Sequence, residues 1–553
     1  MNKVKYIVLA SAVALIGLIF VAMRADWLTS GGTTPGQSKA QNEKLSLHLF
    51  INAPAGAYLP EPKNDFVRQA IEAKFQVDLK VTAMEPGNEY NSQLASLLAA
   101  NDPPDVWLAI SPDGGAYYAL DNALADMTLF VSPATMPNYF NYWMNETELK
   151  QFQFHNKFFR APIPYDKNSY RAYYIRQDWL ENLGLDIPTT YEQYFRVLEA
   201  FTHEDPDRNG KNDTYGFTAS GGGTSISTDW PEYVKNGLLF PAYYDGSQLV
   251  DMQMDLRVGS VADDILKVMD KGLVEPDWFL NKGLDYVDKA VRGKVGIVLG
   301  NTVDFAFDSN ADSLQTRSKA MNPKAEWVPF NPFGDKPLRT AVTPEYPFVF
   351  SNNAAGLNPE KLKRIASILD WLCGEEGFLL THYGMEGKHY SRSGSEITLK
   401  PQMIEEDIVM KGNFLAIWSF FTPNTPQTLG LNVIDPRMTE RDKAIYRTIT
   451  GIPVYESVGT TLTPPLGVSA EAMRARQNEL QVQMLFKDKS GRNWPSYRQD
   501  ILDNYKGTEI FNQYGVKIKA ARTGKKPGIS FSCSSIKSTR NFWSRVLFEF
   551  CPS

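Results

Sequence analysis

Oxygen-bearing side chains recur at alternate positions in one short loop, and they are the residues of the chain best suited to hold a metal ion. The loop runs from Asp205 to Asp213 and reads Asp-Pro-Asp-Arg-Asn-Gly-Lys-Asn-Asp. Calcium prefers six to eight oxygen ligands, which alternate carboxylates and amides around a Gly turn can supply. The spacing predicts a calcium site formed by Asp205, Asp207, Asn209, Asp213 and the main-chain carbonyl of Lys211.

The loop matches the first nine positions of an EF-hand calcium loop and departs from it at the twelfth. Gly216 stands where an EF-hand has a bidentate Glu, so the remaining ligands must be water or come from elsewhere in the chain. We therefore expect a static structural site and no calcium switch. The alternative, a solvated Asp/Asn/Gly turn between a helix and a strand, stays open.

A helix is expected before this loop and a strand after it. Thr190 has Gln193 three residues later, a capping-box arrangement that predicts the start of a helix. The apolar residues that follow share one helical face, namely Tyr194, Val197, Leu198 and Phe201. A β-prone run at 173–175 and a helix at 178–183 come earlier, so residues 173–217 read as one α/β unit.

Strands and helices alternate through much of the remaining chain. Strands are expected at 45–51, 77–81, 103–110, 157–162 and 292–299, and helices at 65–75, 90–99, 261–271 and 361–380. This alternation indicates a parallel α/β sheet, and such sheets bind ligands at the carboxyl ends of their strands. The predicted fold class is therefore α/β.

Composition excludes several classes of function. The 553 residues carry a net charge of −6, without the basic surface that nucleic-acid binding requires. The three Cys and five His form no metal-binding motif, and Cys373 is expected to be a buried thiol. Aromatic residues make up 12% of the chain, which suits stacking on sugar rings but equally suits a large core.

Both ends of the chain differ from the rest in composition. Lys3 and Lys5 precede an uncharged run, so residues 1–26 are predicted to be a signal peptide or a membrane anchor, either of which exports the chain. Residues 27–44, rich in Gly, Ser, Thr, Gln and Asn, are expected to be a flexible tether. Residues 521–553 are basic and rich in Ser, and we expect a poorly ordered tail or a shifted reading frame.

Several phrases, taken in order, give the chain a resemblance to a known family. They are Arg176-Gln177-Asp178-Trp179-Leu180, Pro188-Thr189-Thr190, the calcium loop with Thr214-Tyr215-Gly216, and the segments 272–277, 293–296 and 383–390. From about Leu45 to about Asp503 the chain resembles the extracellular solute-binding proteins of ABC importers, family 1. Within that family it is similar to the large oligosaccharide-binding lipoprotein-like group of Gram-positive bacteria, related to alginate-binding proteins.

The resemblance implies an α/β fold of the two-lobed periplasmic-binding-protein type (type II), in which the lobes close on a ligand in the cleft between them. Residues 45–160 and 292–350 are assigned to the first lobe, and residues 161–291 and 351–520 to the second. The calcium site is implied to be structural. Two features depart from the family: no Cys follows the signal for lipid attachment, and the chain after about Ala521 does not look like the family.

The resemblance also implies that the protein captures an oligosaccharide, delivers it to the permease subunits of an ABC importer, and catalyses no reaction. We expect a monomer at the extracellular face of the cell membrane, either anchored or secreted, with Ca²⁺ as cofactor and no nucleic-acid partner. Two alternatives stay open. One is a secreted carbohydrate-active enzyme, which would need two carboxylates across a sugar, and the other is a cell-surface sugar sensor or adhesion module.

Exposed aromatic side chains would form the sugar-binding surface of such a protein, because their faces stack on the C–H faces of sugar rings. The candidates are Trp107, Tyr117, Trp230, Trp278, Tyr346, Tyr390 and Trp418. The polar sequence around Trp230 favours exposure. Burial in the core is an equal alternative for Trp107 and is most favoured for Trp418.

Overall fold

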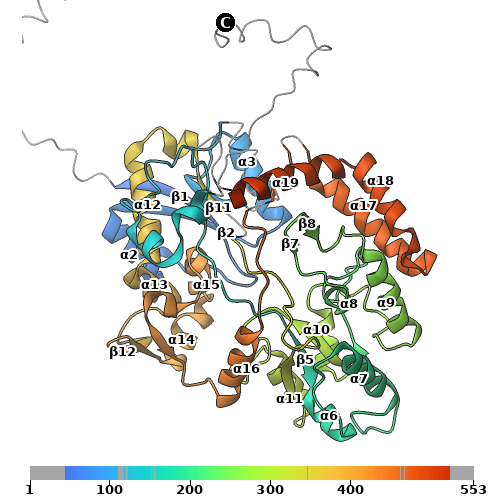
Figure 1. Ribbon diagram of the computed structural model, residues 1–553. Helices are drawn as coiled ribbons and strands as arrows, with labels where there is room; N and C mark the ends of the chain where they lie inside the picture. Colours follow the sequence, from blue (N-terminus) through green and yellow to red (C-terminus); the bar gives the residue numbers. More distant parts are fainter. Residues whose placement is uncertain are drawn as a thin grey trace, which may run out of the picture.

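A computed structural model describes residues 44–109, 118, 122–150, 152, 157–344, 347–460, 462–465 and 468–523. Within these residues the chain forms two lobes, each with its own main β-sheet and its own hydrophobic core (Figure 1). The expected signal or anchor, nearly all of the tether, Tyr117, Tyr346 and most of the tail lie outside the described residues.

The first lobe contains a five-stranded sheet. Its strands, in spatial order, are β2 (Val77–Met84), β1 (Leu45–Asn52), β3 (Val106–Leu108), β11 (Pro347–Phe350) and β4 (Ala161–Pro162). β1, β2 and β3 are parallel, whereas β11 is antiparallel to its neighbours β3 and β4. The helices of this lobe are α2 (Phe66–Phe75), α3 (Asn88–Ala99), α5 (Glu146–Lys150), α12 (Pro359–Cys373), α13 (Glu375–Tyr383), α14 (Pro401–Asp407) and α15 (Leu415–Trp418).

The second lobe contains a four-stranded sheet. Its strands, in spatial order, are β10 (Trp327–Phe330), β5 (Ala172–Arg176), β9 (Val295–Gly300) and β6 (Tyr215–Phe217). β5 is antiparallel to β9 and β10, and β6 is parallel to β9. The helices of this lobe are α6 (Gln177–Leu183), α7 (Tyr191–His203), α8 (Glu232–Lys235), α9 (Val258–Asp270), α10 (Asp285–Val291), α11 (Leu314–Met321), α16 (Glu440–Gly451), α17 (Ala470–Gln483), α18 (Trp494–Asn504) and α19 (Gly507–Thr523).

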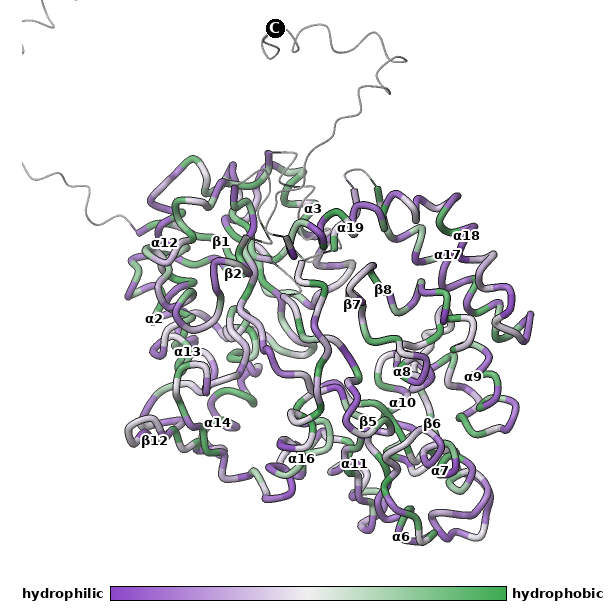
Figure 2. Tube along the Cα trace, viewed as in Figure 1, coloured by the Kyte–Doolittle hydropathy of each residue, from purple (hydrophilic) through white to green (hydrophobic). Residues whose placement is uncertain are grey.

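Two small sheets complete the described fold. The first lobe carries β12 (Tyr390–Ser393), β13 (Glu396–Leu399) and β14 (Asn432–Ile434), and the second lobe carries the hairpin of β7 (Ala242–Tyr244) and β8 (Leu249–Asp251). Figure 2 shows hydrophobic residues along β5 and β6 and hydrophilic residues along the outer loop next to α6 and α7. The hydrophobic strands β5 and β6 thus lie inside the lobe, and the hydrophilic loop lies at its surface.

The assignment of residues 292–350 to the first lobe is wrong for β9 and β10, which pair with β5 in the second sheet. The assignment of 351–520 to the second lobe is equally wrong for α12 to α15, whose buried residues belong to the first core. The chain passes between lobes after β4, after β10 and after β14. The misassignment arose because strand pairing between distant segments is not visible in local periodicity.

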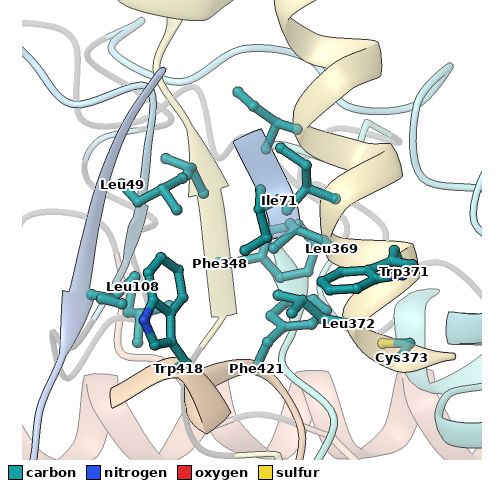
Figure 3. Packing of buried hydrophobic residues seen from close by; sticks show 14 of the residues in the cluster. Leu49, Ile71, Leu108, Phe348, Leu369, Trp371, Leu372, Cys373, Trp418 and Phe421 are labelled. Atoms are coloured by element: carbon teal, nitrogen blue, oxygen red, sulfur yellow. The ribbon is translucent and has the colours of Figure 1, made fainter. Parts of the chain in front are cut away.

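The helix expected over 361–380 is divided into α12 and α13 at Gly374. A Cβ atom on Gly374 would lie 2.9 Å from the side chain of Asn138, so the break coincides with a close approach of another segment. Cys373, the last residue of α12, is buried, and burial raises the pKa of its thiol. Figure 3 shows it beside Leu372 in the first core, as expected from the sequence.

The predicted start of α7 is confirmed. The Thr190 side chain accepts a hydrogen bond from the main-chain N–H of Gln193, and the Gln193 side-chain oxygen accepts one from the Thr190 N–H. This capping box fixes where the helix begins. The face predicted to be apolar is buried, with Tyr194, Leu198 and Phe201 at 0% exposure.

Candidate functional site

The segments that cross between the lobes form the hinge. They meet each main sheet at its carboxyl-end edge, the edge where its parallel strands end. In the first sheet, β4 ends and β11 begins at the edge where β1, β2 and β3 end. In the second sheet, β5 begins and β10 ends at the edge where β6 and β9 end. Two crossing segments, 163–171 and 331–346, join these edges. Ligands of α/β sheets bind outside this edge, so it is the place to look for a site.

Arg171 lies at this edge, immediately before β5, and is held by neighbours from two other segments. Its guanidinium donates to the Thr228 carbonyl at 2.7 Å and to Asn301 Oδ1 at 3.3 Å. The Asp229 carboxylate lies 3.6 Å away, and Arg171 is only 5% exposed. Asn301 directly follows β9, so the antiparallel pairing of β5 with β9 brings these two residues together.

Aromatic residues flank this polar group. The guanidinium carbon of Arg171 lies 5.1 Å from the ring centre of Phe240, and that of Arg339 lies 5.6 Å from the same ring. Burial raises the pKa of the Tyr286 hydroxyl, the charge of Asp229 raises it further, and Arg171 opposes both effects. Tyr286 therefore lies within electrostatic reach of both charged groups. Phe240 and Tyr286 are both partly exposed.

The hinge-edge cluster, defined as Arg171, Asp229, Phe240, Tyr286, Asn301 and Arg339, is suited to binding a polyhydroxylated ligand. Its donors and acceptors come from separate segments of the second lobe and are fixed by hydrogen bonds and cation–π contacts. Aromatic rings can cover the apolar faces of a sugar while amide, carboxylate and guanidinium groups bind its hydroxyls.

The structure places five of the seven predicted sugar-binding aromatics inside the hydrophobic cores. Their exposed fractions are 0% for Trp107, 0% for Trp230, 2% for Trp278, 4% for Tyr390 and 1% for Trp418. The expectation that Trp230 is exposed is therefore wrong, because its indole packs on Phe217 and Trp278 at 5.2 and 5.0 Å. Tyr117 and Tyr346 lie outside the described residues.

Trp418 is buried with its polar group paired. Its indole N–H donates to the Asp65 carboxylate at 2.9 Å inside the first lobe. Asp65 also caps α2 by accepting from the main chain of Arg68 at 3.0 Å. Figure 3 places Trp418 next to Leu108 and Phe421. The polar end of the indole is satisfied inside the core, so Trp418 offers no free face to a ligand.

Sequence reasoning missed the hinge-edge cluster. One signal was present: Asn301 follows a strong strand, where ligand-binding residues of α/β sheets are found. The contributions of Arg171, Phe240 and Arg339 depend on antiparallel pairing and on the bridge between Phe240 and Arg339. Neither of these can be derived from spacing.

The predicted calcium loop forms a tight turn with its oxygen atoms turned inward. Gly210 has a φ of +79°, as the sharp turn requires. The Asp205 carboxylate accepts from the main-chain N–H groups of Asn209 and Gly210 at 3.0 and 2.9 Å. The Asn209 amide N–H₂ bridges Asp207 and Asp213 at 2.9 and 3.0 Å. Asn209 thus links Asp207 and Asp213, while Asp205 holds the turn of the loop.

One feature of this loop fits a bound cation. Asp207 Oδ1 is buried with no hydrogen-bond partner within the described chain, and burial followed by the neighbouring Asp205 raises the pKa of its carboxyl. The point between Asp207 and Asp213 is taken by the Asn209 N–H₂ group, whose orientation is fixed because Asn209 Oδ1 accepts from the Lys211 N–H at 2.8 Å. Among the described residues, however, no group of three or more His, Cys, Asp or Glu is close enough to form a ready metal site.

Two contacts explain how this loop differs from an EF-hand. Gly216 lies in β6 against α7, and a Cβ atom there would stand 2.6 Å from the Leu198 side chain. A Glu at this position would clash, so the twelfth ligand is excluded by packing. Lys294 Nζ lies 2.7 Å from Asp213 Oδ2 and is the first cause of the lowered pKa of that carboxyl.

Residues 67–340 match the family described as bacterial extracellular solute-binding protein. Together with the two-lobed fold, this match shows that the chain belongs to the extracellular solute-binding proteins, as the resemblance implied. The α/β, two-lobed fold class is confirmed.

Particular relatives are similar over most of the chain. The polygalacturonan/rhamnogalacturonan-binding protein YtcQ of Bacillus subtilis is 23% identical over 445 residues, which cover 77% of this chain and 83% of YtcQ. An HMO-binding, ABC-transporter-associated solute-binding protein of Bifidobacterium longum infantis has a TM-score of 0.65 at 16% identity, and the match covers 87% of this chain and 99% of that one.

A third relative is an EF-hand mutant of the Streptococcus pneumoniae ABC-transporter substrate-binding protein FusA in complex with fructo-nystose. Its structure has a TM-score of 0.61 at 14% identity, and the match covers 87% of this chain and 99% of that one. At such identities the likeness of the solved structures shows the fold alone. In the part of the chain that the structure describes, no helix has both the length and the apolar character needed to cross a membrane.

Proposed function

We propose that this protein is the extracellular binding component of an ABC importer and that it captures an oligosaccharide at the hinge-edge cluster. The observation that carries the proposal is the convergence of Arg171, Asp229 and Asn301 with Phe240 at the carboxyl-end edge of the second sheet. Because both crossing segments leave from this edge, closure of the lobes would bring the first lobe over the bound sugar.

The relatives support an oligosaccharide over other solutes. YtcQ is named for polygalacturonan and rhamnogalacturonan, and the FusA structure is a complex with fructo-nystose. We propose that the protein acts as a monomer, is exported by residues 1–26 and remains outside the membrane on its tether or is released. The closed, loaded form is then recognised by membrane permease subunits. Binding is expected without cleavage of the sugar.

Titration calorimetry with the purified chain and a panel of neutral and acidic oligosaccharides tests this function. The expected result is saturable binding of one class, with Kd in the micromolar range or below, and unchanged sugar by chromatography. Release of shorter products would contradict a binding-only role and favour the carbohydrate-active enzyme. Binding to intact polymer alone, with no affinity for oligomers, would favour an adhesion module.

We propose a structural Ca²⁺ in the loop held by Asp205, Asp207, Asn209, Asp213 and the Lys211 carbonyl, in line with the EF-hand of the FusA relative. Chelation is expected to lower the melting temperature, because a ligand that binds only the folded state stabilises it, by about 2.7 kcal/mol at 100 times its Kd. Differential scanning calorimetry with and without chelator measures the change.

Two variants sharpen this measurement. Asp207→Ala is expected to abolish the difference between the two melting temperatures, whereas Asp503→Ala, at an exposed position outside the loop, is expected to preserve it. Identical melting curves of the unmodified protein with saturating calcium and with chelator would mean that the loop is an ordinary solvated turn, held by its own hydrogen bonds and by Lys294.

A further inference from the structure

Glu232 is a buried acidic residue that closely follows Asp229 of the hinge-edge cluster in the sequence. It begins α8, and its side chain is 0% exposed. Residues 227–231, called here the binding segment, lead directly into it. The Thr228 carbonyl accepts from Arg171 at 2.7 Å, and the Asp229 carbonyl accepts from the Tyr173 hydroxyl at 2.8 Å. The place of Glu232 is therefore tied to the groups that hold Arg171.

One carboxylate oxygen of Glu232 leads toward the hinge. Glu232 Oε1 accepts from the Tyr191 hydroxyl at 2.8 Å. The Tyr191 ring stacks on Phe333, with the ring centres 6.2 Å apart and 13° between the ring planes. Phe333 lies in the crossing segment 331–346, which also carries Arg339 of the hinge-edge cluster. Glu232 thus connects the binding segment to the hinge through a hydrogen bond and a ring contact.

The other carboxylate oxygen of Glu232 is not satisfied. Within the described structure Oε2 has no hydrogen-bond partner, and neither has the buried Tyr194 hydroxyl. An ionised carboxylate only accepts hydrogen bonds, and a buried charge without enough partners is strongly unfavourable. The packing around Glu232 therefore suits the protonated, uncharged side chain.

The titratable and charged groups around Glu232 belong to several elements of the second lobe. Burial is the first cause that raises the pKa of Glu232 to about 7, and the Tyr191 hydrogen bond opposes it. The cation of this group, Lys235, lies 2.8 Å from Asp264 Oδ1, so its charge is shared. The surrounding groups are Tyr191 and Tyr194 of α7, Tyr173 of β5, Asp264 of α9, Lys235 of α8 and Asp229 of the binding segment.

We infer that Glu232 is a positioning residue whose protonated form links the binding segment to the crossing segment 331–346 and whose ionisation loosens both. The inference rests on the proposed function, because it concerns the cluster that captures the oligosaccharide. Ionised Glu232 is stabilised only when water reaches it, which requires the binding segment and Tyr191 to separate. Arg171 is then held less firmly, so ligand affinity falls as the pH rises toward 8.

Hydrogen exchange of the full chain without ligand tests this link. Protection factors in residues 227–234 and 331–340 are expected to fall by about tenfold from pH 6 to pH 8. This is the change for an opening in which the pKa of Glu232 returns from about 7 to its ordinary 4.5. Protection of β1 should not change. Glu232→Gln should keep both segments protected at pH 8, whereas the exposed Glu192→Gln should behave as the unmodified protein does.

Two results of this experiment would overturn the inference. One is the same loss of protection in Glu232→Gln as in the unmodified protein. The other is a loss spread evenly over the second lobe, because Glu232 would then affect only global stability. Loss confined to one of the two segments would likewise refute a link between them.

Tyr191→Phe tests the same link without altering Glu232. The variant keeps the ring on Phe333 but removes the hydroxyl that lowers the pKa of Glu232. The carboxyl then keeps its proton to higher pH, so the pH at which the loss of protection levels off should move upward. A hydroxyl with a merely structural role would lower protection equally at pH 6 and pH 8, and that result would contradict the inference.

Calorimetry at pH 6 and pH 8 with fructo-nystose and trigalacturonate, one neutral and one acidic oligosaccharide, measures the effect on binding. The sugar that binds is expected to bind up to about tenfold more weakly to the unmodified protein at pH 8 than at pH 6. Glu232→Gln should bind it equally at both pH values. Equal affinities of the unmodified protein would overturn the inference and leave oligosaccharide capture standing. Failure of both sugars to bind would count against the proposed function, and hydrogen exchange would still decide the inference.

Discussion

Glu232→Gln is expected to stabilise the protein at pH 8 and to have little effect at pH 4.5. Glu232 is 0% exposed, and burial is the main cause that raises the pKa of its carboxyl to about 7. At ~1.4 kcal/mol for each tenfold change in proton affinity, moving the pKa from 4.5 to about 7 destabilises the ionised folded state by at most about 3.5 kcal/mol. Gln removes this cost because it carries no charge at any pH.

The surroundings of Glu232 show why the ionised form is costly. One carboxylate oxygen accepts from the Tyr191 hydroxyl at 2.8 Å, and the other has no hydrogen-bond partner in the described structure. The buried Tyr194 hydroxyl also lacks a partner there, and the charge of Glu232, after burial, raises its pKa. Lys235 only partly offsets the desolvation of the carboxylate. A neutral Gln can keep the bond from Tyr191.

The pH dependence of this effect has a defined sign. Between pH 4.5 and about 7 the folded state holds a proton on Glu232 that the unfolded state releases, so this residue's contribution to stability falls as the pH rises through that window. Urea unfolding of both proteins from pH 4.5 to 8 measures the difference. The exposed Glu192→Gln is the matched control and should show no such trend. Parallel stability curves for Glu232→Gln and the unmodified protein would contradict a raised pKa.

Arg171→Met is expected to weaken oligosaccharide binding by about 30-fold, because hydrogen bonds from a charged donor to the ligand contribute roughly 1.5–3 kcal/mol. The substitution removes the donors to Thr228 and Asn301 and leaves the Asp229 carboxylate without its nearby cation. It also removes one of the two guanidinium groups next to Phe240. Titration calorimetry with the best oligosaccharide measures the loss.

Two companion variants separate binding from folding in this experiment. Asn301→Ala, at an exposed position, should weaken binding with little change in melting temperature. Arg196→Ala, on the exposed face of α7, should change neither. If Arg171→Met and Asn301→Ala both keep full affinity while the protein remains folded, the hinge-edge cluster is not where the sugar binds.

Local features of the fold could be predicted from the sequence, because they depend on neighbouring residues. The start of α7 at Thr190 and its buried face are examples. The turn at Gly210 is another. The division of the chain between lobes could not be predicted, because β9 reaches β5 by antiparallel pairing across more than a hundred residues. Periodicity does not specify such pairings.

The candidate site was harder to predict than the fold for a physical reason. Trp and Tyr side chains stabilise a complex when they stack on a sugar, and they stabilise the folded protein when they fill a core. Residue type alone therefore does not distinguish a sugar-binding position from a core position. Trp230 and Trp418 are core residues. Phe240, which ranks below Trp as a sugar-binding residue by type, lies at the hinge edge between two arginines. Its position follows from tertiary contacts.

Small-angle X-ray scattering with and without the oligosaccharide that binds best tests the central claim most directly. The two lobes, joined by the segments after β4, β10 and β14, are predicted to close on the ligand, so the radius of gyration should fall on saturation. Arg171→Met at the same sugar concentration should keep the larger radius. A radius that stays constant while calorimetry shows the site to be saturated would contradict capture by closure of the lobes.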